Sequence, residues 1–284
     1  MERFYEFAGI GIAVRIPDAM AYTDDRRLTP FRVETVHEPH RFEFAFVETL
    51  PPADGVPVVF DAGFAVYQDG DWTVRYIGAV QNSLDDAYIR VAHCGREHKV
   101  LLKRSYYQGL VSPNTVLNSI GVEHLVAGNG GFILHSSYIR HGERGIVFTA
   151  PSGTGKSTQA DLWQKLRNAQ ILNGDRSAVR VTEDGVCVYG IPFSGSSGYC
   201  ENVTLPLAAV VYLKQAPKTT IRRLHGAEAF RRVWEGVSVN AWDRQDVLAV
   251  SDAVAQVLAQ VPVYELACTP DESAITALEG VFGI

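Results

Sequence analysis

The first part of the chain alternates apolar and polar residues in short runs, which is the pattern of β-strands. In RFEFAFVETL, Phe42, Phe44 and Phe46 share one face of the expected strand. The run FAVYQDGDWTVRYI predicts a hairpin that turns at Asp69-Gly70-Asp71, and AYIRVAHC and KVLLKR predict two further strands. We therefore expect a β-rich N-terminal domain over residues 1–110, serving either as an accessory domain or in substrate recognition.

The pattern changes at Ser112, which can cap a helix that begins at Pro113. Apolar residues recur there at helical spacing until GNGG (128–131) ends the element. FILHSSYIRHGERGIVFTA follows as two strands joined by a polar turn. Beyond it we expect a helix over 156–167, strands in AQIL, SAVRVTEDGVCVYGIPF, LAAVVYLKQ and PVYELAC, and helices in GAEAFRRVWEGV, RQDVLAVSDAVAQVLAQ and DESAITALEGVF. Strands alternating with helices predict an α/β domain over residues 111–284.

Composition narrows the class of protein. The 284 residues carry a formal net charge of −6, which argues against a nucleic-acid partner or an anionic membrane partner. The four cysteines are scattered without a CxxC pair, so neither a zinc site nor a disulfide framework is indicated. The N-terminal sequence lacks the apolar run of a signal peptide, and no later run is long enough to span a bilayer. We expect a soluble cytoplasmic protein.

The most specific signal lies in GIVFTAPSGTGKSTQADLW. Its segment from Ala150 to Ser157 has Walker A spacing, with Ala150 in place of the usual first glycine. Glycines let backbone N–H groups curl around phosphate oxygens, and the helix that follows adds partial positive charge. The residues expected to bind the phosphates of a nucleotide are Ser152, Gly153, Thr154, Gly155, Lys156, Ser157 and Thr158. Lys156 would meet the β- and γ-phosphates, and the Ser157 hydroxyl would ligate Mg²⁺.

An acidic partner for this loop is less obvious. No long apolar strand ending in Asp-Glu follows, as an ordinary nucleotide hydrolase would have. The nearest acid is Asp175, after the modest run AQILNGD. A carboxylate beside Mg²⁺ and phosphates could accept the proton of a hydroxyl or bind the metal, and a turn-capping role is the alternative.

The segment from His135 to Val179 resembles the catalytic domain of the HPr kinase/phosphorylase family, which has the phosphoenolpyruvate-carboxykinase-like fold. The resemblance covers the predicted 111–284 domain and is specific around its motifs. It implies that His135, on the strand before the loop, orients the γ-phosphate or steadies Asp175. It also implies that Asp175 is the general base or a metal ligand, and that ATP and Mg²⁺ are the cofactors. Gly174 replaces the first acid of the family's acidic pair.

The family's downstream motif EIRGLG is replaced here by GIPFSGSSGYCENVTLP, where Glu201 could serve as a second metal ligand and Asn202 is a weaker candidate. With this departure the chain resembles divergent relatives of the family that phosphorylate a serine of a small peptide. Whether it has phosphorylase activity or forms a homo-oligomer is left open. Arg176 could meet a phosphate or form a surface salt bridge. Of Arg222 and Arg223, at most one can point into a site. We expect His124 to be structural and His141 to be solvated.

The leading hypothesis is an ATP-dependent kinase that transfers the γ-phosphoryl group to a hydroxyl, with serine of a peptide or small protein as the acceptor. A kinase of a free small molecule such as serine is one alternative. A nucleotide-sensing regulatory protein without transfer activity is another, because the Walker A pattern alone predicts only binding.

Overall fold

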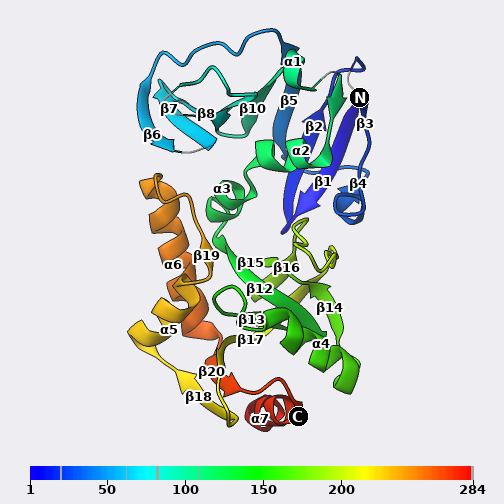
Figure 1. Ribbon diagram of the computed structural model, residues 1–284, viewed down its shortest axis with the longest axis vertical. Helices are drawn as coiled ribbons and strands as arrows, with labels where there is room; N and C mark the ends of the chain where they lie inside the picture. Colours follow the sequence, from blue (N-terminus) through cyan, green and yellow to red (C-terminus); the bar gives the residue numbers. More distant parts are fainter. Residues whose placement is uncertain (20, 62, 81–82, 108, 283–284) are drawn as a thin grey trace. The chain divides into compact units, whose positions relative to one another are not determined.

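A computed structural model describes residues 1–19, 21–61, 63–80, 83–107 and 109–282. Contacts between residues divide the chain into two compact units, Met1–Val122 and Glu123–Ile284. Figure 1 labels most of the elements of each unit.

The first unit is built on one sheet with the strand order β4-β1-β2-β5-β10-β9-β8-β7-β6. In β5, Phe42 and Phe44 are buried and Phe46 is half-buried, as the alternation predicts. The hairpin at Asp69–Trp72 is confirmed, with Gly70 at φ 59°. The elements of this unit are β1 (Glu2–Phe7), β2 (Ile10–Arg15), β3 (Ala21–Tyr22), η1 (Thr29–Phe31), β4 (Arg32–Val33), β5 (His40–Val47), β6 (Val56–Asp61), β7 (Gly63–Asp69), β8 (Trp72–Ala79), β9 (Ile89–Cys94), β10 (Glu97–Lys103), α1 (Arg104–Tyr107), β11 (Leu110–Val111) and α2 (Pro113–Ile120).

The helix expected from Pro113 begins as predicted, because the Ser112 hydroxyl accepts a hydrogen bond from the Thr115 amide. The expectation that it continues to GNGG is wrong. Gly121 adopts φ 64° and ends α2, and α3 (Val122–Ala127) follows as a separate helix. The Arg75 guanidinium donates to the Ser119 carbonyl at 3.1 Å, which ties α2 to the first unit. The units therefore divide after Val122, whereas the change of pattern placed the boundary after residue 110.

The second unit is mixed α/β, which agrees with the α/β class predicted for this part of the chain. Its main strand order is β13-β12-β15-β16-β17-β20-β18, with β14 and β19 also paired to β12 and with β13 paired to β17. Its elements after α3 are β12 (Gly131–His141), β13 (Arg144–Thr149), α4 (Lys156–Arg167), β14 (Gln170–Asn173), β15 (Arg176–Thr182), β16 (Gly185–Gly190), β17 (Thr204–Gln215), β18 (Thr220–Leu224), α5 (Gly226–Trp234), β19 (Val237–Ser238), α6 (Arg244–Gln260), β20 (Val263–Cys268) and α7 (Glu272–Phe282). The helix predicted over 156–167 is confirmed as α4.

Helices cover both faces of this sheet. Val147 and Phe148 are successive residues of β13 and point to opposite faces. Phe148 packs in one buried cluster with Trp163 of α4 and Ile275 of α7. Val147 packs in another cluster with residues of α5 and α6. Figure 1 shows α4 and the α5–α6 pair on opposite sides of the strands. Among the described residues, no helix combines the length and apolar character needed to cross a membrane.

The loops of the candidate site follow the carboxyl ends of several strands that lie near one another in the sheet. Strands β13, β17 and β20 are mutually parallel neighbours. Strand β14 runs parallel to β13, since both pair antiparallel with β12. The carboxyl ends of β14, β13, β17 and β20 therefore meet at one edge, which is where ligands bind in sheets of this kind.

Candidate active site

The loop of residues 150–157 connects β13 to α4 and has the backbone that an anion site needs. Gly153 and Gly155 adopt φ values of 77° and 115°, which a residue with a side chain rarely tolerates. Gly155 is the N-cap of α4 and offers no side-chain hydrogen bond, and the first turn of α4 contains no acidic residue. The first amides of α4 and the positive end of its dipole are thus available to an anion.

Lys156 is buried inside this loop, with 7% of its surface exposed. Its Nζ donates to the carbonyl oxygens of Ala150 at 3.0 Å and Pro151 at 3.4 Å. Burial lowers the pKa of the Lys156 ammonium, and the negative charge of Asp175 acts in the opposite direction. The cation expected to contact phosphate therefore lies in the loop and within electrostatic range of the expected acid.

Asp175 and His135 lie together beside the loop. The Asp175 Oδ1 is 3.7 Å from His135 Nε2, and its Oδ2 is 3.6 Å from Arg176 Nε. The Ser136 amide donates to the Asp175 carbonyl at 2.9 Å, which holds the turn after β14 against β12. The structure thus brings together two residues that are 40 positions apart in the sequence and that were singled out on resemblance.

Asn173 fixes the turn that presents Asp175, and sequence reasoning missed it. The Asn173 side chain is buried, and its Oδ1 accepts from the amides of Asp175 and Arg176, both at 2.9 Å. Its Nδ2 donates to the Ile191 carbonyl at 2.8 Å. An Asn that bonds to the backbone two residues later is an Asx turn, so the NGD sequence carried the signal.

Gly195 supports Asp175 from behind. A Cβ atom at Gly195 would lie 2.9 Å from both the Cβ and the Cγ of Asp175, and Gly195 also adopts φ 52°. Only glycine fits this position without moving the carboxylate. The loop of residues 193–199 therefore lies directly against the side chain of the expected general base.

The same loop explains why position 174 has no acid. A Cβ atom at Gly174 would lie 2.1 Å from the Oγ of Ser197 and 2.6 Å from its Cβ. Ser197 is held in place because its hydroxyl donates to the Ser194 carbonyl at 2.7 Å. The 193–199 loop thus occupies the space that a carboxylate at position 174 would need.

The remaining candidates are placed as follows. Glu201 is exposed and has no ion-pair partner in the described part of the chain, so its role as second metal ligand stays a prediction. Arg176 pairs with Glu123 at 3.2 Å, and Arg222 pairs with Glu228 and Glu265. His124 pairs with Asp246 at 2.9 Å. His141 is half-exposed, in keeping with the expectation that it is solvated, although its ring also makes a T-shaped contact with the buried Trp163, with centroids 5.0 Å apart.

We predict opposite shifts of the His135 pKa in two variants. Burial and the Lys156 charge hold this pKa below its ordinary value of 6.5, and Asp175 opposes them. Lys156→Ala should raise the pKa of His135, and Asp175→Asn should lower it further; an NMR titration of the imidazole measures both. Shifts in the same direction would contradict the arrangement. Because the folded-state pKa of His135 is depressed, its contribution to stability is complete above pH 6.5 and is lost as the pH falls from 6.5 through the lower folded-state pKa.

Comparisons with known proteins add little to this geometry. No protein-family model matches the sequence, and no curated protein matches it. Among solved structures, the chain is similar to the HPr(Ser) kinase/phosphatase from Coxiella burnetii, with 11% sequence identity and a TM-score of 0.32 over 52% of this chain and 95% of that chain. A TM-score this low is insufficient for the likeness to bear on fold or function.

Proposed function

We propose that this chain is an ATP-dependent kinase that transfers the γ-phosphoryl group to a hydroxyl, with serine of a peptide or small protein as the acceptor. One observation carries the proposal. The Asp175 carboxylate, 3.7 Å from His135, shares a sheet edge with an amide-lined loop that contains a buried lysine. Phosphoryl transfer depends mainly on positioning and on neutralising charge, and these groups supply both.

The loop would bind the triphosphate. Phosphate oxygens would accept from the free amides at the start of α4, where no acidic side chain competes. Lys156 would exchange its bonds to the Ala150 and Pro151 carbonyls for charge-assisted bonds to the β- and γ-phosphates. The nucleotide thus replaces contacts that the free loop makes with itself.

Asp175 would act as the general base. It takes the proton of the acceptor hydroxyl as the new oxygen–phosphorus bond forms and the bond from the γ-phosphorus to ADP breaks. The pKa of His135 lies below its ordinary value, so this side chain would be mostly neutral near pH 7. It could then hydrogen-bond to Asp175 or to the γ-phosphate. Asn173 and Gly195 would keep the carboxylate in place.

The site also fits a magnesium ion. The Ser157 side chain is exposed, and its hydroxyl makes no hydrogen bond within the described residues. Together with Asp175 it offers the oxygen ligands that Mg²⁺ prefers, and phosphates and water would complete the coordination. When bound, the ion would neutralise charge on the phosphates. Glu201 stays the predicted additional ligand.

Two features support a peptide or small-protein acceptor. The sequence resembles kinases of this kind, and the hydroxyl-rich 193–199 loop contacts Asp175 through Gly195. An acceptor that binds this loop would place its hydroxyl beside the base. Free serine is the smaller acceptor to be compared with it.

A nucleotide-sensing regulator is the second candidate, and it is favoured by one observation. Ser197 fills the space of a carboxylate at position 174, so the site has lost one acid relative to the family it resembles. A protein of this type would bind ATP in the same loop without producing ADP.

The test is transfer of label from γ-labelled ATP to serine-containing peptides, with free serine as a second acceptor. We expect phosphopeptide and ADP in equal amounts, dependent on Mg²⁺. Binding of ATP without ADP release would overturn the kinase proposal in favour of the regulator. Labelled free serine with no labelled peptide would overturn the peptide acceptor alone.

A further inference from the structure

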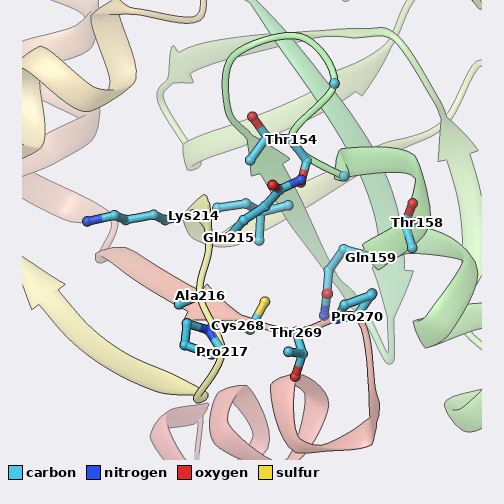
Figure 2. A pocket seen from close by; sticks show the side chains of 13 residues that line it. Thr154, Thr158, Gln159, Lys214, Gln215, Ala216, Pro217, Cys268, Thr269 and Pro270 are labelled. Carbon is cyan, nitrogen blue, oxygen red and sulfur yellow. The ribbon is translucent and has the colours of Figure 1, made fainter.

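A cavity lies beside the 150–157 loop and is lined by three of its residues, Gly153, Thr154 and Gly155. Its volume is about 540 Å³, which suits a small organic ligand. Its walls come from the loop, the start of α4 and the ends of β17 and β20 (Figure 2). Leu213, Pro217 and Pro270 provide apolar surface, and Thr158, Gln159 and Cys268 provide polar groups.

Gln159 is a buried polar group that lacks a partner. Only 2% of its surface is exposed, and its Nε2 makes no hydrogen bond to any residue that the structure describes. Figure 2 shows the Gln159 side chain extending from α4 with its amide beside Pro270. A buried amide nitrogen without a partner is costly in a folded protein, and a ligand in this cavity would satisfy it.

The strand order gives the cavity its place relative to the loop. At the carboxyl edge of the sheet, β14 lies on one side of β12, and β13, β17 and β20 follow on the other. The Asp175 turn follows β14, the 150–157 loop follows β13, and the cavity lies beyond the ends of β17 and β20. A nucleotide whose γ-phosphate is next to Asp175 would therefore extend its nucleoside into the cavity.

We infer that this cavity binds the nucleoside of the donor nucleotide and that the Gln159 amide selects adenine. The inference rests on the proposed function for the direction in which the nucleotide lies. The glutamine amide can present one N–H donor and its carbonyl acceptor side by side, and these match the ring nitrogen and the amino group on an adenine edge. The two N–H donors of guanine call for a carboxylate, and none of the described residues that line the cavity is acidic.

The rest of the cavity suits a planar base. Pro217 and Pro270 stand on opposite sides of it in Figure 2, and both present apolar faces. Burial raises the pKa of the Cys268 thiol, so this group stays neutral beside the base. Inorganic polyphosphate would fill the loop but not this cavity.

The experiment compares the binding of ATP, GTP and inorganic tripolyphosphate by calorimetry, without an acceptor. We expect the wild-type protein to bind ATP at least about tenfold more tightly than either other ligand. Gln159→Leu should weaken ATP binding about tenfold and leave tripolyphosphate unchanged. Gln159→Glu should shift the preference toward GTP. Gln164→Leu, on the exposed face of the same helix, is the matched control and should change nothing.

Equal affinity for ATP and tripolyphosphate in the wild-type protein, or equal weakening of both by Gln159→Leu, would overturn the inference.

A measurement that needs no variant is alkylation of Cys268, followed by mass spectrometry. ATP should protect this thiol from alkylation and tripolyphosphate should not; equal protection would overturn the inference.

The two proposals can fail separately. Selective ATP binding without transfer would refute the kinase and leave the cavity assignment standing. Transfer from ATP and tripolyphosphate at equal rates would support the kinase and refute the assignment of the cavity to the nucleoside.

Discussion

Asp175→Asn should lower the rate of phosphoryl transfer about 10²- to 10⁴-fold and weaken the binding of ATP much less, because the asparagine carbonyl can still ligate Mg²⁺. Asparagine has the same shape as aspartate, so the contact with Gly195 and the backbone bonds to Asn173 and Ser136 persist. It cannot take a proton from the acceptor at neutral pH. The rate constant comes from labelled transfer under saturating ATP, and the affinity from calorimetry.

The control for this variant is Asp161→Asn, which removes one negative charge from an exposed position on α4. It should transfer phosphate at the wild-type rate. If Asp175→Asn also transfers at that rate, Asp175 is not the base. A loss of ATP affinity equal to the loss of rate would instead make Asp175 a group that contributes to binding only.

Lys156→Ala should weaken ATP binding by about 10²-fold or more and reduce transfer by at least as much. Hydrogen bonds between charged groups contribute about 1.5–3 kcal/mol each, and this lysine is expected to make two of them. Calorimetry with ATP measures the affinity, and thermal unfolding checks that the fold survives when the Ala150 and Pro151 carbonyls lose their donor.

Lys165→Ala is the matched control, because Lys165 is exposed on the same helix. It should bind ATP like the wild-type protein. Undiminished ATP binding by Lys156→Ala would mean that the 150–157 loop is not the phosphate site. The two variants together separate the proposed roles, since Asp175→Asn should bind without transferring and Lys156→Ala should do neither.

Much of the local structure was predictable because it depends on neighbouring residues. The helix over 156–167 follows from the Walker A spacing and amphipathic pattern, and the hairpin at Asp69–Trp72 follows from its turn residues. The end of α2 at Gly121 was not predicted, because the helical spacing of apolar residues continues across this glycine into α3. Only the αL conformation at that glycine separates the two helices.

The site was less predictable, because its contacts join distant parts of the chain. The approach of Asp175 to His135 depends on the pairing of β12 with β14 and β15, and resemblance rather than spacing pointed to it. Gln159 gave no signal at all. A glutamine inside a helix is ordinary in sequence, and only its burial without a partner marks it.

Gly195 has a consequence for any attempt to redesign this protein. Exchanging, lengthening or shortening an exposed segment is the usual way to give an enzyme a new specificity, because such segments tolerate change. Here residues 193–199 stand directly behind the reactive carboxylate and fill the gap beside Gly174. Grafts in this segment should therefore alter turnover as well as selectivity, and libraries that keep Gly195 and Ser197 fixed should retain the most active members.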